Sequence, residues 1–179
     1  MNRFALSFLL ALTSCCSLIL AQSQPSNPAP NTGKGLGPLE VRSNTNGFDV
    51  RKYTSKLFSV VRSHWYEEIP EEARAPQRKA GKVTIDFRVM KDGTITDVNY
   101  LERSGNQALD RAAFDSIVHS SPLKPLPAQF ECAFAAYRFH FLYNPDELKK
   151  DDLKNTANSE PLLPCVTTTI RFEDTEIKK

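Results

Sequence analysis

The side chains that could do chemistry in this sequence are few and widely spaced. The three histidines are His64, His119 and His140. None of them stands in a His-Glu-x-x-His pattern, which would place two metal ligands on one turn of a helix. The paired carboxylates at 67–68 and 71–72 have the charge pattern of a solvated helix end and connector. We therefore expect no catalytic residue, no metal site and no cofactor, and a binding role in place of an enzymatic one.

The cysteines offer one covalent cross-link. Cys15 and Cys16 fall in an apolar N-terminal run, which leaves Cys132 and Cys165 in the rest of the chain. These two do not form a Cys-x-x-Cys redox motif. In an oxidising compartment they are candidates for a disulfide, and closing a loop of about 34 residues would stabilise the fold by roughly 3.7 kcal/mol. The alternative is two buried, unpaired thiols.

Residues 1–21 have the form of an export signal or an N-terminal anchor. Arg3 precedes an apolar run from Phe4 to Ala21, as in a secretory signal. Three outcomes remain open at this stage: cleavage after Ala21, cleavage before a lipidated Cys15 at the box Leu-Thr-Ser-Cys, or an uncleaved anchor at the short end of the length that spans a bilayer. All three predict export.

The charge balance argues against a nucleic-acid-binding protein. The chain has 23 basic and 21 acidic residues, for a net charge of +2. Nucleic-acid-binding domains usually concentrate positive charge on one face or along one helix. The longest basic runs here are the lysine pairs at 149–150 and 178–179, so we expect no nucleic-acid partner.

The elements that must position any site begin after a linker. Residues 22–47 are rich in Pro, Gly, Asn and Ser without periodicity, which predicts a linker that cannot form a core. From Phe48 to Trp65 the apolar residues follow helical spacing, with Asp49 as the expected N-cap and Pro70 after the helix end. This pattern predicts the first helix.

A hairpin and a second helix follow. Alternating residues predict strands at 83–89 and 95–101, joined by a tight turn at Asp92-Gly93. Val98 and Leu101 can share one face only if a bulge or the strand end lies between them. The second helix ends before Pro122, and either Ser104, in a capping box with Gln107, or Asn106 could cap its start.

A strongly aromatic strand completes the predicted domain. Aromatic and other side chains alternate from Tyr137 to Tyr143. The order of helix, hairpin, helix and strand predicts an α+β fold, with a three-stranded antiparallel sheet and two helices on one face. The tail at 145–179 is charged, and its segment 165–172 is rich enough in β-branched residues to form an added strand.

Several of these segments together resemble the TonB C-terminal domain family, which includes TonB- and TolA-like energy transducers. They are Gly81-Lys-Val-Thr-Ile-Asp-Phe-Arg-Val-Met-Lys-Asp-Gly-Thr-Ile, Arg103-Ser-Gly-Asn-Gln-Ala-Leu-Asp-Arg-Ala-Ala, Pro125-Leu-Pro127 and Tyr137-Arg-Phe-His-Phe. The resemblance covers about residues 48–144. It implies a periplasmic domain that binds outer-membrane transporters and passes on force from proton-driven motor proteins of the inner membrane.

The resemblance also implies a binding site. In the family, a short segment of the receptor adds as a strand to the edge of the last strand, which is β-augmentation. The corresponding residues here are Tyr137, Arg138, Phe139, His140, Phe141, Leu142 and Tyr143. The aromatic side chains would face the core, and outward side chains such as Arg138 and His140 would give selectivity.

Three departures from the family keep a second function open. The apolar run at 4–21 contains no histidine, the linker reaches about 80 Å at most, and the segment 165–172 is additional. If bonded through Cys132 and Cys165, that segment could pair with the edge that a receptor would use. The alternative function is an exported or lipidated envelope adaptor without energy coupling, bound to another envelope protein or to a second copy as a homodimer.

Overall fold

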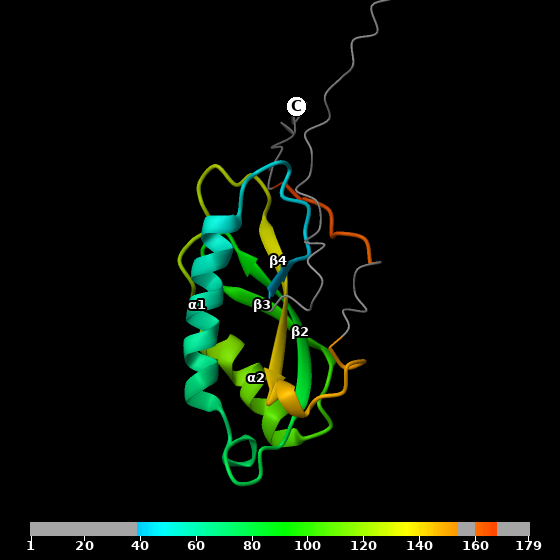
Figure 1. Ribbon diagram of the computed structural model, residues 1–179. Helices are drawn as coiled ribbons and strands as arrows, with labels where there is room; N and C mark the ends of the chain where they lie inside the picture. Colours follow the sequence, from blue (N-terminus) through cyan, green and yellow to red (C-terminus); the bar gives the residue numbers. More distant parts are fainter. Residues whose placement is uncertain (1–38, 154–159, 168–179) are drawn as a thin grey trace, which may run out of the picture.

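The computed structural model describes residues 39–153 and 160–167 (Figure 1). The predicted export segment at 1–21 lies outside this range. None of the helices within it has the length and hydrophobicity needed to span a bilayer. The elements in chain order are β1 (Leu39–Val41), α1 (Arg51–Glu68), β2 (Gly81–Met90), β3 (Ile95–Glu102), α2 (Gln107–His119) and β4 (Phe134–Tyr143), with 3-10 turns at Glu71–Ala73 and Pro145–Glu147.

Helix α1 follows the predicted apolar stripe. Leu57 and Val61 are buried on its inner face, and the ring of Trp65 packs edge-on against Phe141 with 5.4 Å between ring centroids. Before the helix, the Asp49 carboxylate accepts a hydrogen bond from the backbone N–H of Arg51 at 3.0 Å. This bond satisfies one of the unpaired donors at the helix start. The N-cap itself is Val50, one residue after the predicted Asp49, so that prediction is wrong by one position.

The hairpin of β2 and β3 contains the predicted turn and an irregular strand. Gly93 has φ +92°, a conformation that glycine adopts without a steric penalty. The register of β2 with β3 shifts twice along the pair, and Asp97 in β3 has φ +52°. Leu101 is half exposed, so the conflict between Val98 and Leu101 is resolved by a bulge, as expected.

Helix α2 is capped by Asn106. Its side-chain oxygen accepts hydrogen bonds from the N–H groups of Ala108 at 2.9 Å and Leu109 at 3.3 Å. Ser104 has a different role, because its hydroxyl donates to the carboxylate of Asp110 at 2.7 Å. Of the two predicted caps, the structure therefore has Asn106.

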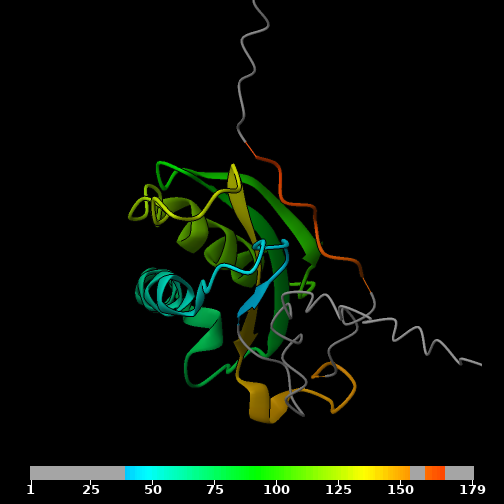
Figure 2. The same ribbon diagram turned by 90° about the horizontal axis from the view of Figure 1, so that it is seen from above.

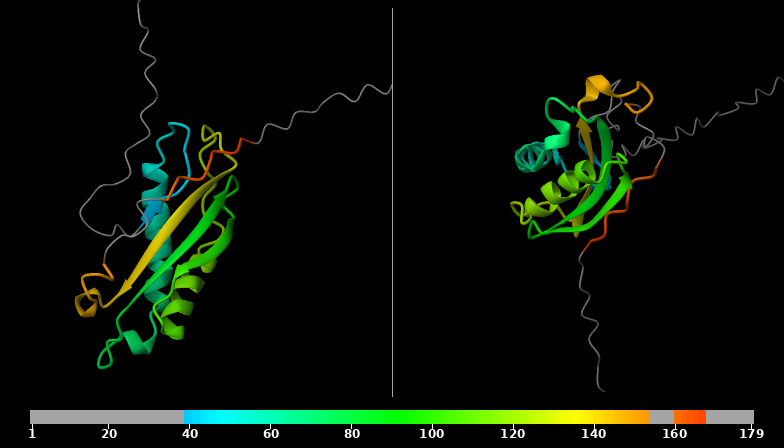
Figure 3. Two further views of the ribbon diagram at one scale, coloured as in Figure 1. Left: turned by 90° about the vertical axis from the view of Figure 1, so that its right-hand side faces the viewer. Right: turned by 90° about the horizontal axis from the view of Figure 1, so that it is seen from below.

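The sheet is antiparallel, with strand order β1-β4-β2-β3. Both helices cover one face of it, and the segment 160–167 runs along the other side (Figures 2 and 3). The core lies between the sheet and the two helices. Its fully buried members include Leu57, Val61, Val83, Ile85, Phe87, Val89, Leu109, Ala113, Ile117, Phe139 and Phe141. The predicted α+β fold is confirmed for the three long strands and both helices.

The first strand differs from the prediction. Residues 22–47 were expected to be linker, yet Leu39–Val41 form β1, which pairs with β4. Leu39 and Val41 also pack against the hydrophobic core. Because of this pairing the folded domain includes residues 39–47, and β4 lies between two strands.

Candidate functional site at the outer edge of strand β4

The two faces of β4 have opposite character. Its aromatic side chains point toward the helices and are almost fully buried, as the alternation predicts: Tyr137, Phe139, Phe141 and Tyr143. Arg138 and His140 project from the other face, as expected for outward side chains of this strand. They are only 2% and 4% exposed. Glu40 of β1 and Glu160 of the tail contact them on this face.

Arg138 is a buried cation paired with two partly exposed carboxylates. Its guanidinium donates to both carboxylate oxygens of Asp86, from Nε at 2.6 Å and from Nη2 at 2.8 Å. The same Nη2 donates to Glu160 Oε2 at 2.7 Å. The hydrogen bonds to Asp86 are the main cause of a raised pKa for Arg138, ahead of the opposing effect of burial. The charge on Arg138 is thus stabilised by partners from β2 and the tail.

His140 connects the sheet to β1. Its Nδ1 lies 3.1 Å from the hydroxyl of Thr84, and its Nε2 donates to Glu40 Oε1 at 3.2 Å. Next to Thr84, Lys82 forms an ion pair with Glu102 at 2.9 Å. Glu40 and Glu160 were not identified from the sequence as site residues. Only the alternation in Leu39-Glu40-Val41 hints at a strand, and three residues are too few to distinguish one from linker.

The edge of β4 that faces away from β2 is covered by β1 over three positions. Leu39 is opposite Phe139, Glu40 opposite Arg138 and Val41 opposite Tyr137. Beyond β1, the N–H of Arg42 donates to the carbonyl of Ala136 at 2.8 Å. Since backbone groups alternate in direction along an antiparallel strand, the N–H and C=O groups of Arg138, His140 and Leu142 face this same edge.

The tail holds the β1 segment in place. The N–H of Leu163 donates to the Arg42 carbonyl at 2.8 Å, and the Asn44 N–H donates to the Leu163 carbonyl at 2.8 Å. The carboxylate of Glu160 forms an ion pair with Arg42 at 3.2 Å. The β1 segment therefore pairs with β4 on one side and with the tail on the other.

The predicted disulfide is confirmed. Cys132 and Cys165 are bonded, and beside them the N–H of Ala133 donates to the Val166 carbonyl at 2.6 Å. The predicted strand at 165–172 is present only as an isolated bridge between Cys132 and Thr167, and residues 168–172 lie outside the described range. The tail therefore reaches the start of β4, while β1 covers the middle of its edge.

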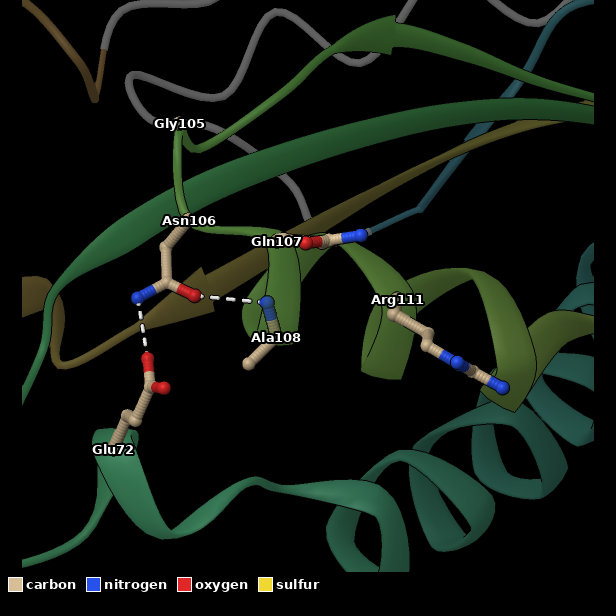
Figure 4. Close-up of a pocket in the computed structure, with 6 residues that line it drawn as sticks. All are labelled: Glu72, Gly105, Asn106, Gln107, Ala108 and Arg111. Carbon is tan, nitrogen blue, oxygen red and sulfur yellow. Dashed lines mark hydrogen bonds between the residues drawn. The ribbon is translucent and has the colours of Figure 1, made fainter.

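Apart from the β4 edge, a concave region lies at the start of α2 (Figure 4). It has a volume of about 590 Å³ and is lined by Glu72, Gly105, Asn106, Gln107, Ala108 and Arg111. The side chain of Asn106 uses its oxygen to cap α2 and its nitrogen to donate to Glu72 at 2.6 Å. Across the part of the chain that the structure describes, no group of three or more His, Cys, Asp or Glu side chains could hold a metal ion. The β4 edge is therefore the stronger candidate site.

Comparison with known proteins identifies the domain. Residues 67–144 match the family model described as Gram-negative bacterial TonB protein C-terminal. Over these residues the chain is similar to the TonB C-terminal family. The chain is also similar to Protein TonB of Haemophilus influenzae, at 33% identity over 49% of this chain and 32% of that protein. Protein TonB of Pasteurella multocida is 35% identical over 45% of this chain and 30% of that protein.

Among solved structures, the chain is similar to the NMR solution structure of the Helicobacter pylori TonB-CTD. The identity is 22% and the TM-score is 0.43, over 60% of this chain and 91% of that chain. The match to the curated TonB proteins spans about a third of their length.

Proposed function

We propose that this TonB C-terminal domain binds an extended segment of an outer-membrane transporter in the periplasm, by strand addition at the outer edge of β4. Within an assembly that includes inner-membrane motor proteins, the same contact would transmit force for uptake. The site comprises Tyr137–Tyr143, and the observation that carries the proposal is the regularity of this edge. Similarity to the TonB C-terminal family supports a binding role over a catalytic one.

The two long strands that could accept a partner differ in regularity. Strand β4 pairs with β2 over ten consecutive positions without a register shift. The outer strand β3 pairs with β2 through two shifts and contains the positive φ of Asp97. Bulges twist an edge away from a straight incoming strand and protect it from pairing. Strand β4 therefore offers the better template for a partner strand.

The cover on β4 is short. Strand β1 has three residues, and no other described strand pairs with His140–Tyr143 on this side. Each backbone hydrogen bond has a net value of about 1 kcal/mol, so a three-residue strand contributes a few kcal/mol through its ladder. A partner strand would form the same bonds with β4. Exchange of β1 for a partner is therefore close to balanced in hydrogen bonding.

Hydrogen exchange with a receptor peptide tests the proposal. The probes are synthetic peptides that copy the N-terminal plug segments of outer-membrane receptors. Binding should slow exchange of the amides of His140 and Leu142. The control is the same peptide with N-methyl groups on alternate amides, which removes its donors toward the domain and should abolish the protection. Protection confined to β3, or no protection by any receptor peptide, would refute strand addition at β4.

The second candidate function is an exported or lipidated adaptor without energy coupling. It is favoured by the short tether, because β1 begins at Leu39 and leaves only residues 22–38 between the apolar run and the domain. Fully extended, these 17 residues reach about 53 Å, compared with about 80 Å for the linker expected from the sequence. Mass spectrometry of the mature protein separates the two functions. An uncleaved segment 1–21 favours the transducer, whereas a chain that begins at Gln22 or at lipidated Cys15 favours the adaptor.

A further inference from the structure

Strand β1 occupies the site proposed above, so its side chains indicate which partner that site accepts. Building on the proposed function, we infer that the partner segment carries a carboxylate residue between two apolar residues, in the alternating pattern apolar–acidic–apolar. The inference rests on the contacts of Leu39, Glu40 and Val41 and on the charges that remain when they leave.

The acidic position is defined by two basic side chains of β4. Glu40 lies directly opposite Arg138 in the register, and its carboxylate accepts from His140 Nε2 at 3.2 Å. Both β4 side chains are almost fully buried. Release of β1 would remove the carboxylate that His140 contacts. A partner that returned a carboxylate to this position would restore the contact, whereas a lysine there would place like charges together.

The lysine and arginines on this face keep carboxylate partners outside β1, so the acidic preference rests on the His140 contact and on the register opposite Arg138. Without β1 and the tail, the basic groups on this face of the sheet are Lys82, Arg88, Arg138 and His140. The facing carboxylates are Asp86, Asp97 and Glu102. In the folded chain the remaining carboxylates near Arg138 and His140 come from Glu160 in the tail and Glu40 in β1. The carboxylate contacts of Arg138 and His140 thus come in part from the segments that cover them.

The two apolar positions are defined by the opposite face of β1. Leu39 and Val41 are half-buried and pack against the core cluster, opposite Phe139 and Tyr137. Because successive side chains of a strand point to opposite faces, a single extended segment can fill both apolar positions and the acidic one between them. Polar residues at the apolar positions would leave this part of the core exposed.

The test uses peptides that differ in one residue. The probes are acetylated and amidated Thr-Val-X-Val-Thr-Gly, with Glu, Gln or Lys at X, and a copy of residues 37–44 is the positive control. The protein tested is the full mature chain with Glu40→Pro, a change that removes the N–H and the carboxylate of residue 40. The wild-type chain, in which β1 stays in place, is the reference. A second variant, Leu39→Ser with Val41→Ser, releases β1 by removing its apolar contacts with the core and keeps Glu40. Circular dichroism and thermal melting check that each variant folds.

The expected result is a graded affinity. The Glu peptide should bind the Glu40→Pro chain about 5- to 30-fold more tightly than the Lys peptide, with Gln between them, since exchanging an opposite for a like charge across strands is worth this much. NMR shifts should map to Arg138–Leu142. In a chain that also carries His140→Gln, the preference for Glu should shrink.

Two other results would overturn the inference in different ways. Peptides that bind at β4 with equal affinity for Glu, Gln and Lys would refute the acidic preference and leave strand addition intact. If neither variant binds even the copy of residues 37–44, the edge does not accept strands and the proposed function fails as well. A chain that dimerises on sedimentation and excludes the peptides would make a second copy the occupant.

Discussion

Reduction of the disulfide should destabilise the domain through the tail. The bond joins Cys132, which is 1% exposed at the start of β4, to Cys165 in the tail, with a sequence separation of 33 residues. Cross-linking a loop of this length lowers the entropy of the unfolded chain enough to stabilise the fold by about 3.7 kcal/mol. A folded unit of about 120 residues has an unfolding entropy of roughly 0.25 kcal/mol/K, so reduction should lower Tm by up to about 15 °C.

The stabilisation lost on reduction has two parts: a lower stability of the whole domain and the release of the tail alone. Without the covalent bond, the tail is held by Glu160 on Arg138 and Arg42, and by the backbone bonds of Leu163 and Val166. If the tail detaches first, Tm falls by less than the full amount. In that case the amides of Asn44 and Ala133, which donate to the tail, should exchange much faster while the β2–β4 ladder keeps its protection.

Calorimetry and hydrogen exchange on oxidised and reduced protein measure the two parts. The control is the double variant Cys132→Ala and Cys165→Ala, which should melt like the reduced wild type and ignore the reductant. An unchanged Tm together with unchanged exchange at Ala133 would show that the bond contributes nothing to the fold. That outcome would refute the assignment of the tail as a cross-linked part of the domain.

Three further predictions concern the turn, the ionic network and a buried tyrosine. Gly93→Ala should destabilise the domain by about 3 kcal/mol or more, because its Cβ would collide with the Leu123 backbone at a positive φ. The control is Gly105→Ala, which is also at positive φ but has open space around the added Cβ, and it should lose only about 1 kcal/mol. Urea unfolding measures both losses. Asp86→Asn should lose about 1.5–3 kcal/mol, since Arg138 remains buried without its bidentate carboxylate; equal stability in denaturant would contradict this role. Burial raises the pKa of Tyr137 to about 12, so above pH 10 the unfolded chain loses a proton that the folded domain keeps, and stability should fall by up to about 2–3 kcal/mol between pH 10 and 12. Tyr137→Phe should make this alkaline decline shallower, and an identical slope would disprove the effect.

The long elements could be predicted because their signals are local. The apolar stripe that ends at Trp65, the Asp92-Gly93 turn and the aromatic alternation that begins at Tyr137 each lie within a few turns or one strand of sequence. The spacing of Val98 and Leu101 even indicated an irregular strand, which the structure shows as a bulge. Such features follow from the geometry of helices and strands, which relates neighbouring residues to common faces.

The covered edge of β4 was decided only by the tertiary structure. Arg138 and His140 alternate with aromatic residues, so the sequence by itself determined which face of the strand they occupy. It could not determine that this face is buried, since Glu40 is 100 residues from His140 and Glu160 is 22 residues from Arg138. Strand β1 is stabilised by pairing with β4 and by the tail held at Cys165. The local sequence of three residues carries too little periodicity to specify that strand, so its position depends on partners that only folding brings together.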